Sequence, residues 1–406
     1  MKTHSSSGTI TTYPGKSGTT YRARYYIVEG GKRIDKYGAT HTTKKAARAE
    51  LTAILNSINT GTHVDRSDMT VEGWLTHWLD KWALEVGPKA KERYSTSLSW
   101  YVVPTLGKMK LQDVTLDDVQ GLYQHLREDG RRIRRATQGP GLARVTIMSI
   151  HDVFKRAMQQ ALASNLIARN PCIGVKIMKD SDDAPDAERP GVVSIRDCLS
   201  QTQLTALLDG FKGHEFFPLV YLAAATGARR GELLALRWAD LDLEKSKLSI
   251  GKSLEEIGRG EMRTIRAKAP KTKSGARIID LPPDSISVLR EHRAKQMQAA
   301  LAVGVTDRAG LIFPRHPWEP HEYESPGSLT RRFTRLARWR GFDVHLHQLR
   351  HTHASLLLRN HVPVTDVARR LGHANASVTL QIYAHAIESD QQHTVDAVAQ
   401  ILRDGK

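Results

Sequence analysis

An acidic, proline-containing segment interrupts the chain and constrains its fold more than any other feature of the sequence. Residues 179–191 read KDSDDAPDAERPG and contain no apolar run that could enter a hydrophobic core. Segments of this composition connect domains and lie in solvent. Since a domain commonly holds about 100–200 residues, the chain on either side is long enough for cores of its own. The sequence therefore predicts several domains, with a linker over residues 179–196.

Apolar residues follow two different patterns before this linker. Residues 1–66 alternate as strands do in GTITTY, TTYRARYYIV and KRIDKYGAT, and a helix KKAARAELTAILNSI follows a capping threonine, Thr43. Residues 67–178 instead show helical spacing, for example in WLTHWLDKW, whose tryptophans are expected in the core, and in RVTIMSIHDVFKRAMQQALA. The first segment predicts a small sheet covered by one helix, and the second predicts a helical bundle.

Residues 197–406 are predicted to be mostly helical with one short sheet. The stretches KLSIGKS, MRTIRAKA and ARIIDLP suggest its strands, and a short amphipathic helix around Val395, Val398 and Leu402 is expected in the C-terminal tail. The predicted fold class is mainly α with small β-sheets, an α+β chain of three domains. These are residues 1–66, 67–178 and 197–406, with the linker before the last.

The charge of the chain indicates a polyanionic partner. Lysine and arginine number 60 against 43 aspartates and glutamates, so the net charge at pH 7 is +17. No apolar run approaches the roughly 18 residues of a membrane span, and MKTHSSSGTI does not resemble a signal peptide. Cys172 and Cys198 are too few for a disulfide framework or a thiolate zinc site, which fits a reducing cytoplasm. We expect nucleic acid as the partner and no membrane association.

Two basic regions are the candidate DNA-binding surfaces. Residues 1–66 hold eleven lysines and arginines against four acids, and a basic glycine-containing loop, REDGRRIRRATQGPG, lies between the last two helices of the bundle. Either region could also be a solvated surface. The candidates are Arg22, Arg24, Lys44, Lys45, Arg131, Arg132, Arg134, Arg135 and Arg144.

Three stretches after the linker carry residues suited to phosphoryl transfer. In ATGARRGELLALRW, Gly227 can end a helix so that Arg229 lies at a turn, and in HLHQLRHTHASLLL, His347 and Arg350 share one helix face. The third stretch, LGHANASVTLQIYAHA, contains His373 and Tyr383. Arginine forks bind phosphate oxygens and stabilise transition-state charge, and a tyrosine hydroxyl can act as nucleophile. Taken singly, each residue also fits a packing or surface role.

Together these residues resemble the signature of the tyrosine recombinase (phage-type integrase) family. The motifs occur in the family's order, in TGARRGE, PKTKSGARIIDLP, HQLRH, LGH and IYAH, and the resemblance covers residues 197–390. The matching residues are Arg229, Lys271, His347, Arg350, His373 and Tyr383. Lys273 lies in the same hairpin, although the family's KT usage favours Lys271. Residues 67–178 resemble the family's core-binding domain and residues 1–66, less specifically, its arm-binding domain.

The resemblance implies a role for each matched residue. Tyr383 would attack a DNA phosphodiester to leave a 3′-phosphotyrosyl bond and a free 5′-hydroxyl, Arg229 and Arg350 would bind the non-bridging oxygens, and Lys271 would protonate the leaving oxygen. His347 would act in acid/base transfer at the tyrosine and His373 would hydrogen-bond the phosphate. Glu232 is expected to orient this cluster.

The resemblance also implies what the protein acts on and with. It would be a site-specific recombinase that integrates or excises a phage or other mobile element, without a metal, another cofactor or ATP. Expected partners are double-stranded DNA with core and arm attachment sites, three further copies of the chain in a tetramer, a directionality factor and a host DNA-bending protein. The expected location is the cytoplasm of a bacterial host.

Three alternatives use the same residues differently. The histidines at 345, 347, 351, 353, 361, 373 and 385 suggest a metal-dependent nuclease, but no acid lies between Asp343 and Asp366 to complete a ligand set. A type IB topoisomerase shares the tyrosine chemistry and relaxes supercoils. A DNA-binding regulator would need only the basic charge and the helices, which leaves the arginine, histidine and tyrosine set without a function.

Overall fold

The structure is a computed structural model of the chain, and it describes residues 3–15, 18–29, 32–60, 63–83, 86–132, 139–177, 198–258, 263–270, 275–307, 309–383 and 402–403. The chain divides into two compact units, Met1–Asp180 and Ser181–Lys406. The fold is mainly helical with small sheets, as the sequence predicts. The predicted linker at 179–196 lies outside the described residues, and so does the predicted tail helix apart from two helical residues, Leu402 and Arg403.

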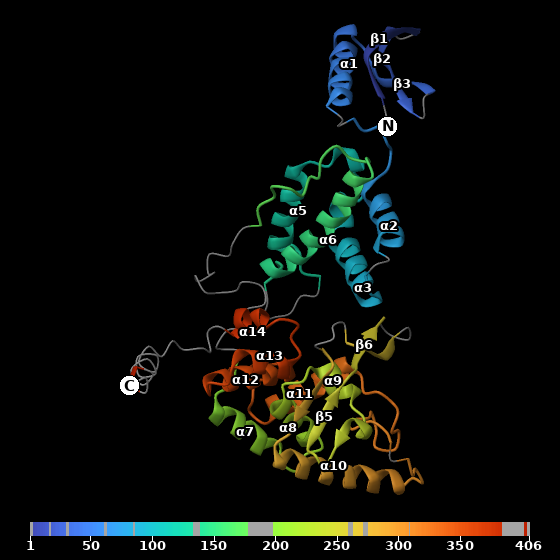
Figure 1. The fold of residues 1–406 in the computed structure, drawn as a ribbon. Helices are drawn as coiled ribbons and strands as arrows, with labels where there is room; N and C mark the ends of the chain where they lie inside the picture. Colours follow the sequence, from blue (N-terminus) through green and yellow to red (C-terminus); the bar gives the residue numbers. More distant parts are fainter. Residues whose placement is uncertain are drawn as a thin grey trace. The chain divides into compact units, whose positions relative to one another are not determined.

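A three-stranded antiparallel sheet and one helix form the first part of the chain (Figure 1). The strands lie in the order β1 (Thr3–Gly15), β2 (Gly18–Glu29) and β3 (Lys32–His41), and α1 (Lys44–Asn59) follows. Alternate residues of β2 are buried in a small core with apolar residues of α1; the buried members of this core are Ala23, Tyr25, Ile27, Leu51 and Ile58. Because side chains alternate along a strand, the intervening Arg22 and Arg24 belong to the opposite face.

The next part of the chain is a bundle of helices with its own apolar core. Its elements are α2 (Val71–Lys81), α3 (Pro88–Ser97), a π-helical turn (Leu98–Val102), α4 (Val103–Leu106), α5 (Leu116–Asp129) and α6 (Arg144–Ala163). Trp74 and Trp78 are buried as predicted, but Trp82 is 48% exposed. The helical stripe does not reach Trp82 because α2 ends at Lys81.

In its described residues, the second unit is mostly helical and contains two separate small sheets. One sheet has the order β4–β5–β8 and the other is the hairpin β6–β7, whereas the sequence suggested one sheet. The strands are β4 (Leu241–Asp242), β5 (Lys247–Ile250), β6 (Ser253–Ile257), β7 (Thr264–Lys268) and β8 (Arg277–Asp280). The helices are α7 (Gln201–Phe211), α8 (Phe217–Thr226), α9 (Arg230–Ala235), α10 (Pro283–Leu301), α11 (Pro326–Trp339), α12 (Leu346–Arg359), α13 (Val364–Leu371) and α14 (Ala376–Tyr383).

Helix α8 packs against α12 in the second unit. Gly227 ends α8 in a left-handed conformation with φ of 61°, as the sequence predicts. A Cβ atom at Gly227 would lie only 2.7 Å from Cδ2 of His353 on α12, so glycine is needed both for the turn and for the close approach of the two helices. This approach brings the end of α8 beside the catalytic candidates of α12.

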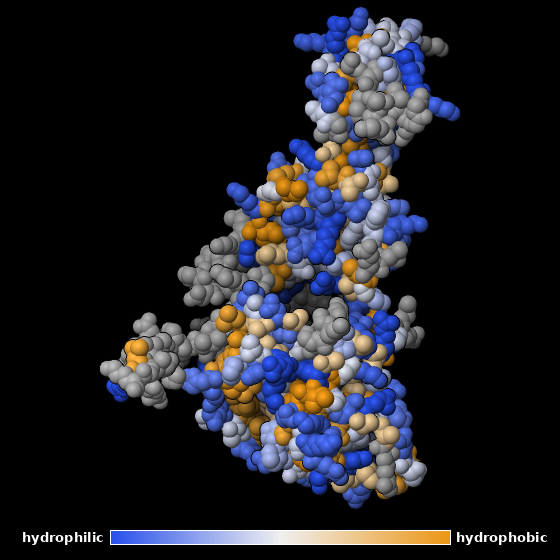
Figure 2. All heavy atoms as spheres, in the orientation of Figure 1, coloured by the Kyte–Doolittle hydropathy of each residue, from blue (hydrophilic) through white to orange (hydrophobic). Residues whose placement is uncertain are grey.

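Polar residues cover much of the visible face of each unit, and apolar residues form separate patches between them (Figure 2). Among the described helices, none has the length and apolarity that crossing a membrane requires.

Candidate active site

Arg229 lies at the turn between α8 and α9 and is fixed by Glu232. Its backbone N–H donates to Oε2 of Glu232 at 2.8 Å, and its Nη1 donates to Oε1 at 3.0 Å. The Arg229 side chain remains 42% exposed, whereas that of Glu232 is 7% exposed. The buried carboxylate therefore holds the arginine at the start of α9 while leaving its guanidinium accessible to a ligand.

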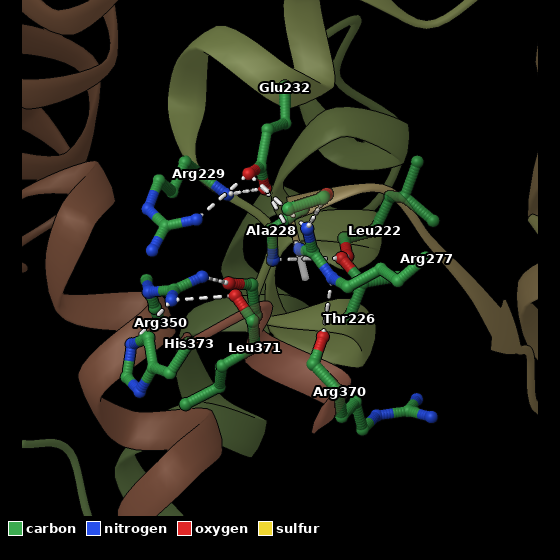
Figure 3. Close-up of polar contacts among 12 residues, drawn as sticks. Leu222, Thr226, Ala228, Arg229, Glu232, Arg277, Arg350, Arg370, Leu371 and His373 are labelled. Carbon is green, nitrogen blue, oxygen red and sulfur yellow. Dashed lines mark hydrogen bonds and ion pairs between the residues drawn. The ribbon is translucent and has the colours of Figure 1, made fainter. Parts of the chain in front are cut away.

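A second arginine, Arg277 of β8, binds the same carboxylate from the opposite side (Figure 3). Its Nη2 donates to Oε2 of Glu232 at 2.9 Å, and its Nε donates to the carbonyl oxygen of Arg370 at 2.7 Å. Burial alone would raise the pKa of Glu232, but the hydrogen bonds and positive charges of Arg277 and Arg229 outweigh it and lower that pKa below 4.5. Glu232 is therefore ionised at neutral pH.

Arg277 is not among the site residues predicted from the sequence. The only available signal was a charged residue inside the strand-like stretch ARIIDLP. In the structure the Arg277 side chain is 4% exposed. It binds both Glu232, the carboxylate that orients Arg229, and the carbonyl oxygen of Arg370 near the end of α13.

Arg350 is buried at the meeting point of two helix ends (Figure 3). Its Nη1 donates to the carbonyl oxygen of Gly227 at 2.7 Å, and its Nη2 donates to that of Leu371 at 2.8 Å. Carbonyl groups at helix C-termini carry partial negative charge, so they orient and partly stabilise the guanidinium. Burial and then the charge of Arg229 lower the Arg350 pKa to about 10, and the group stays cationic at neutral pH.

His373 follows the left-handed Gly372 that ends α13 and contacts Arg350. Its Nε2 lies 2.8 Å from Nη2 of Arg350, and its Nδ1 lies 2.7 Å from the hydroxyl oxygen of Thr379. Burial and the neighbouring arginines lower its pKa to about 4, so the ring is neutral at neutral pH. Since a guanidinium can only donate, Nε2 accepts and the ring proton lies on Nδ1, which donates to Thr379. Both ring nitrogens thus have protein partners.

Tyr383, the last residue of α14, is only 1% exposed. Its ring packs in an apolar cluster with Ala354, Leu358, Val367 and Leu371. Burial raises the pKa of the phenol to about 12, although the positive charges of Arg350 and Arg229 act in the opposite direction. The hydroxyl is therefore protonated at neutral pH and must lose its proton before or during nucleophilic attack.

The imidazole at the tyrosine hydroxyl belongs to His351. Its Nδ1 lies 2.9 Å from Oη of Tyr383. The family resemblance implied acid/base transfer at the tyrosine for His347, whose ring instead lies edge-on to that of His351, with 4.6 Å between ring centroids. Loss of surrounding water, followed by the charges of nearby arginines, lowers the pKa of His347 below 6.5. His351 appeared in the sequence only as one of several clustered histidines.

These groups lie together in the part of the chain that matches a known protein family. A model of the phage integrase family matches residues 200–390, which span the whole site. The chain belongs to the tyrosine recombinase family. It is a tyrosine-type site-specific recombinase, and the alternatives of a nuclease, a topoisomerase and a regulator without chemistry are set aside.

Similar proteins cover nearly the whole length of the recombinase. A "Tyrosine recombinase XerC-like" protein of Caldanaerobacter subterraneus subsp. tengcongensis is 28% identical over 385 residues, 91% of this chain and 93% of that protein. An "Integrase" of Streptomyces ambofaciens is 26% identical over 360 residues, 88% of this chain and 86% of that protein.

Solved structures share the fold. The Tn1549 transposon integrase in complex with transposon right end DNA matches with a TM-score of 0.64 and 20% identity, covering 82% of this chain and all of that one. A lambda integrase dimer bound to a COC′ core site matches with a TM-score of 0.53 and 15% identity, covering 92% of this chain and 94% of that one.

The predicted catalytic lysine of the recombinase, Lys271, lies outside the described residues, as does Lys273. The hairpin β6–β7 that precedes it is anchored at two points. A Cβ atom at Gly231 would lie 2.8 Å from the carbonyl oxygen of Leu254, so glycine allows β6 to pack against α9. Glu256 of β6 also accepts a hydrogen bond from the backbone N–H of Gly327 at the start of α11, at 3.1 Å.

The DNA-binding candidates belong to the first unit. Arg24 donates to Asp35 at 2.7 Å, and Arg22 donates to the carbonyl oxygen of Gly38 at 3.1 Å. Both guanidinium groups lie near the ring of the exposed Tyr37, at 6.0 and 5.5 Å from its centroid. The recombinase therefore presents arginine and tyrosine together on the face of β2 and β3 opposite α1.

The remaining candidates lie on α1 and near the ends of α5 and α6. Lys44 and Lys45 are exposed at the start of α1, and Arg144 is the first residue of α6. Arg131 and Arg132 donate to the carbonyl oxygens of Gly141 and Trp100. Arg134 and Arg135 lie outside the described residues.

Within the described ranges, no group of three or more His, Cys, Asp or Glu side chains has an arrangement that could hold a metal ion.

Proposed function

We propose that the recombinase cuts and rejoins DNA at specific sites through a 3′-phosphotyrosyl intermediate, and so integrates or excises a phage or other mobile element. The observation that carries this proposal is the placement of the buried Tyr383 next to the arginines. Its hydroxyl contacts His351, which follows Arg350 on α12, and Arg350 binds the carbonyl oxygen of Gly227, two residues before Arg229. Positive charge that is fixed before the substrate arrives can stabilise the extra negative charge of a phosphoryl transition state.

Each residue has a defined part in the proposed reaction. Arg229 and Arg350 bind the non-bridging phosphate oxygens, and Glu232 keeps Arg229 in position. Tyr383 forms the new bond to phosphorus while the bond to the 5′ oxygen breaks, and Lys271 donates a proton to that oxygen. His373 gives up its contact with Arg350, its ring proton moves from Nδ1 to Nε2, and Nε2 then donates to the phosphate. His347, whose ring meets that of His351, takes part in acid/base transfer at the tyrosine through this neighbour. Resealing uses the phosphotyrosine bond, so neither ATP nor a metal is needed.

The proposed assembly is a homotetramer on two DNA duplexes. Structures of lambda integrase have been solved as a dimer bound to a core site and as a tetramer bound to a Holliday junction. By extension, residues 67–178 would bind core-site DNA, residues 197–406 would cut and rejoin it, residues 179–196 would link these two domains, and residues 1–66 would bind arm sites. A directionality factor and a host DNA-bending protein would act with this assembly in the bacterial cytoplasm.

The chemical proposal is tested by trapping the covalent complex. The recombinase is incubated with DNA fragments that join element and host, in the presence of a chelator, and denatured before resealing. We expect a denaturant-resistant adduct that joins Tyr383 to the 3′ phosphate of the cut strand, mapped by mass spectrometry, and sequencing of the trapped DNA identifies the site. An adduct at the 5′ end, or one that forms only with added divalent metal, contradicts the proposal.

The proposed role of residues 1–66 predicts separable binding sites. The sheet and the helical bundle have separate apolar cores, so a chain beginning at Asp68 should keep a folded bundle. We expect it to cleave isolated core-site DNA at the rate of the whole chain and to lose affinity for DNA with flanking arm sites, measured by gel shift over a range of salt concentrations. Unchanged integration of a complete attachment site by the shortened chain contradicts the two-site arrangement.

A further inference from the structure

His351 contacts the hydroxyl of Tyr383, although it is not among the residues that match the family signature. Tyr383 lies among apolar side chains, and its hydroxyl is the polar atom at which reaction must begin. The imidazole Nδ1 of His351 is 2.9 Å from this oxygen, within the range for proton transfer along a hydrogen bond. The two rings are 5.7 Å apart between centroids and tilted by 53°, so the nitrogen meets the hydroxyl rather than the ring face.

The environment of His351 suits an acceptor of this proton. His351 lies one turn after His347 on α12, and the two rings meet edge-on at an angle of 87°. Next to it, Arg350 is fixed to the backbone carbonyl groups of Gly227 and Leu371. The helix therefore holds a base at the nucleophile and a cation at the phosphate on adjacent residues.

We propose that His351 is the general base that takes the proton of Tyr383 during DNA cleavage. This inference rests on the proposed function. In the cleavage step the bond from Oη of Tyr383 to phosphorus forms, the phenolic proton passes to Nδ1 of His351, the bond from phosphorus to the 5′ oxygen breaks, and that oxygen takes its proton from the general acid. Resealing runs in reverse, and His351 returns the proton to Tyr383 as the phosphotyrosine bond breaks.

A simpler role would be to satisfy a buried hydroxyl, since leaving such a group unpaired costs stability. His351→Asn separates the two roles. The asparagine amide can reach the same hydroxyl and hydrogen-bond it, but it cannot accept a proton at neutral pH. The matched control is His361→Asn, which makes the same change after the end of α12, at a residue with φ of 58° where asparagine is tolerated.

We expect His351→Asn to fold and to bind site DNA as the unaltered chain does, but to form the covalent adduct about 10²–10⁴-fold more slowly. His361→Asn should form it at the normal rate. Cleavage of DNA with a bridging 5′ sulfur, whose leaving group needs no general acid, should remain slow in His351→Asn, because the missing group acts on the tyrosine. Incorporation of 3,5-difluorotyrosine at position 383, which makes the phenol more acidic, should restore much of the lost rate in this variant.

Two results would overturn the assignment of His351. A normal rate in His351→Asn would show that a hydrogen bond suffices, and restoration by the bridging sulfur would place His351 on the leaving-group side. Both require that the unaltered recombinase forms the Tyr383 adduct. If the unaltered chain forms none, the proposed function itself fails, and the two failures are therefore distinguishable.

Discussion

Replacing Tyr383 with phenylalanine is expected to abolish covalent DNA cleavage, with a loss of at least about 10⁴-fold in the rate of adduct formation. The change removes one oxygen from a ring that packs against Leu358, Val367 and Leu371 and leaves the ring in place. The fold and the arginines that meet the phosphate should therefore be unaffected. The measurements are gel shift for binding to site DNA and denaturing electrophoresis for the adduct.

The outcome of this substitution separates chemistry from binding. Binding of Tyr383→Phe to core-site DNA should match that of the unaltered chain. A denaturant-resistant complex formed by Tyr383→Phe would show that another residue is the nucleophile. The matched comparison is Tyr323→Phe, the same change at a tyrosine of the same unit that packs at the edge of the main core and should leave cleavage intact.

Replacing Glu232 with alanine is expected to have two effects: it destabilises the second unit and it prevents DNA cleavage. Arg277 would remain buried, with its side chain 4% exposed, and would lose its carboxylate partner. Breaking a buried ion pair in this way costs about 3–5 kcal/mol in the free energy of unfolding. Arg229 would also lose the two hydrogen bonds that orient it. Denaturant unfolding and the adduct assay measure the two effects.

The control for this prediction is Glu291→Ala on α10. Glu291 forms an ion pair with Lys295 at 2.6 Å, but both side chains are more than 60% exposed. Exposed pairs contribute little to stability. We expect no measurable shift of the unfolding midpoint for Glu291→Ala, and an equally small shift for Glu232→Ala would contradict the structural role assigned to Glu232.

The stabilising effect of Glu232 should also depend on pH. Because Arg277 and Arg229 hold its pKa below the usual 4.5, the ionised carboxylate contributes stability that is complete above pH 4.5. This contribution is lost as the pH falls through the lowered pKa of the folded protein. The difference in unfolding free energy between the unaltered chain and Glu232→Gln should therefore be largest above pH 4.5 and shrink at more acidic pH.

The sequence predicted the parts of the fold that depend on local patterns. Strand alternation gave the sheet of residues 1–66, and helical spacing gave the bundle that follows, because both patterns repeat over a few residues. The prediction failed where a pattern ran past the end of its element, as at Trp82, or where strand pairing had to be chosen among distant segments. After residue 240, β8 pairs with β5 and β6 pairs with β7, so the strands form two sheets rather than the one expected.

Short motifs in the sequence were enough to identify the residue types available for DNA cleavage and their order along the chain. How those residues are held depends on contacts between distant segments. Arg350 is fixed by a carbonyl 123 residues away, Glu232 is shared with an arginine 45 residues away, and the tyrosine hydroxyl meets His351 rather than His347. These partners are chosen by the packing of α8, α12, α13 and β8, and the physical reason is that a buried polar group must find its hydrogen bonds among whatever groups that packing brings near.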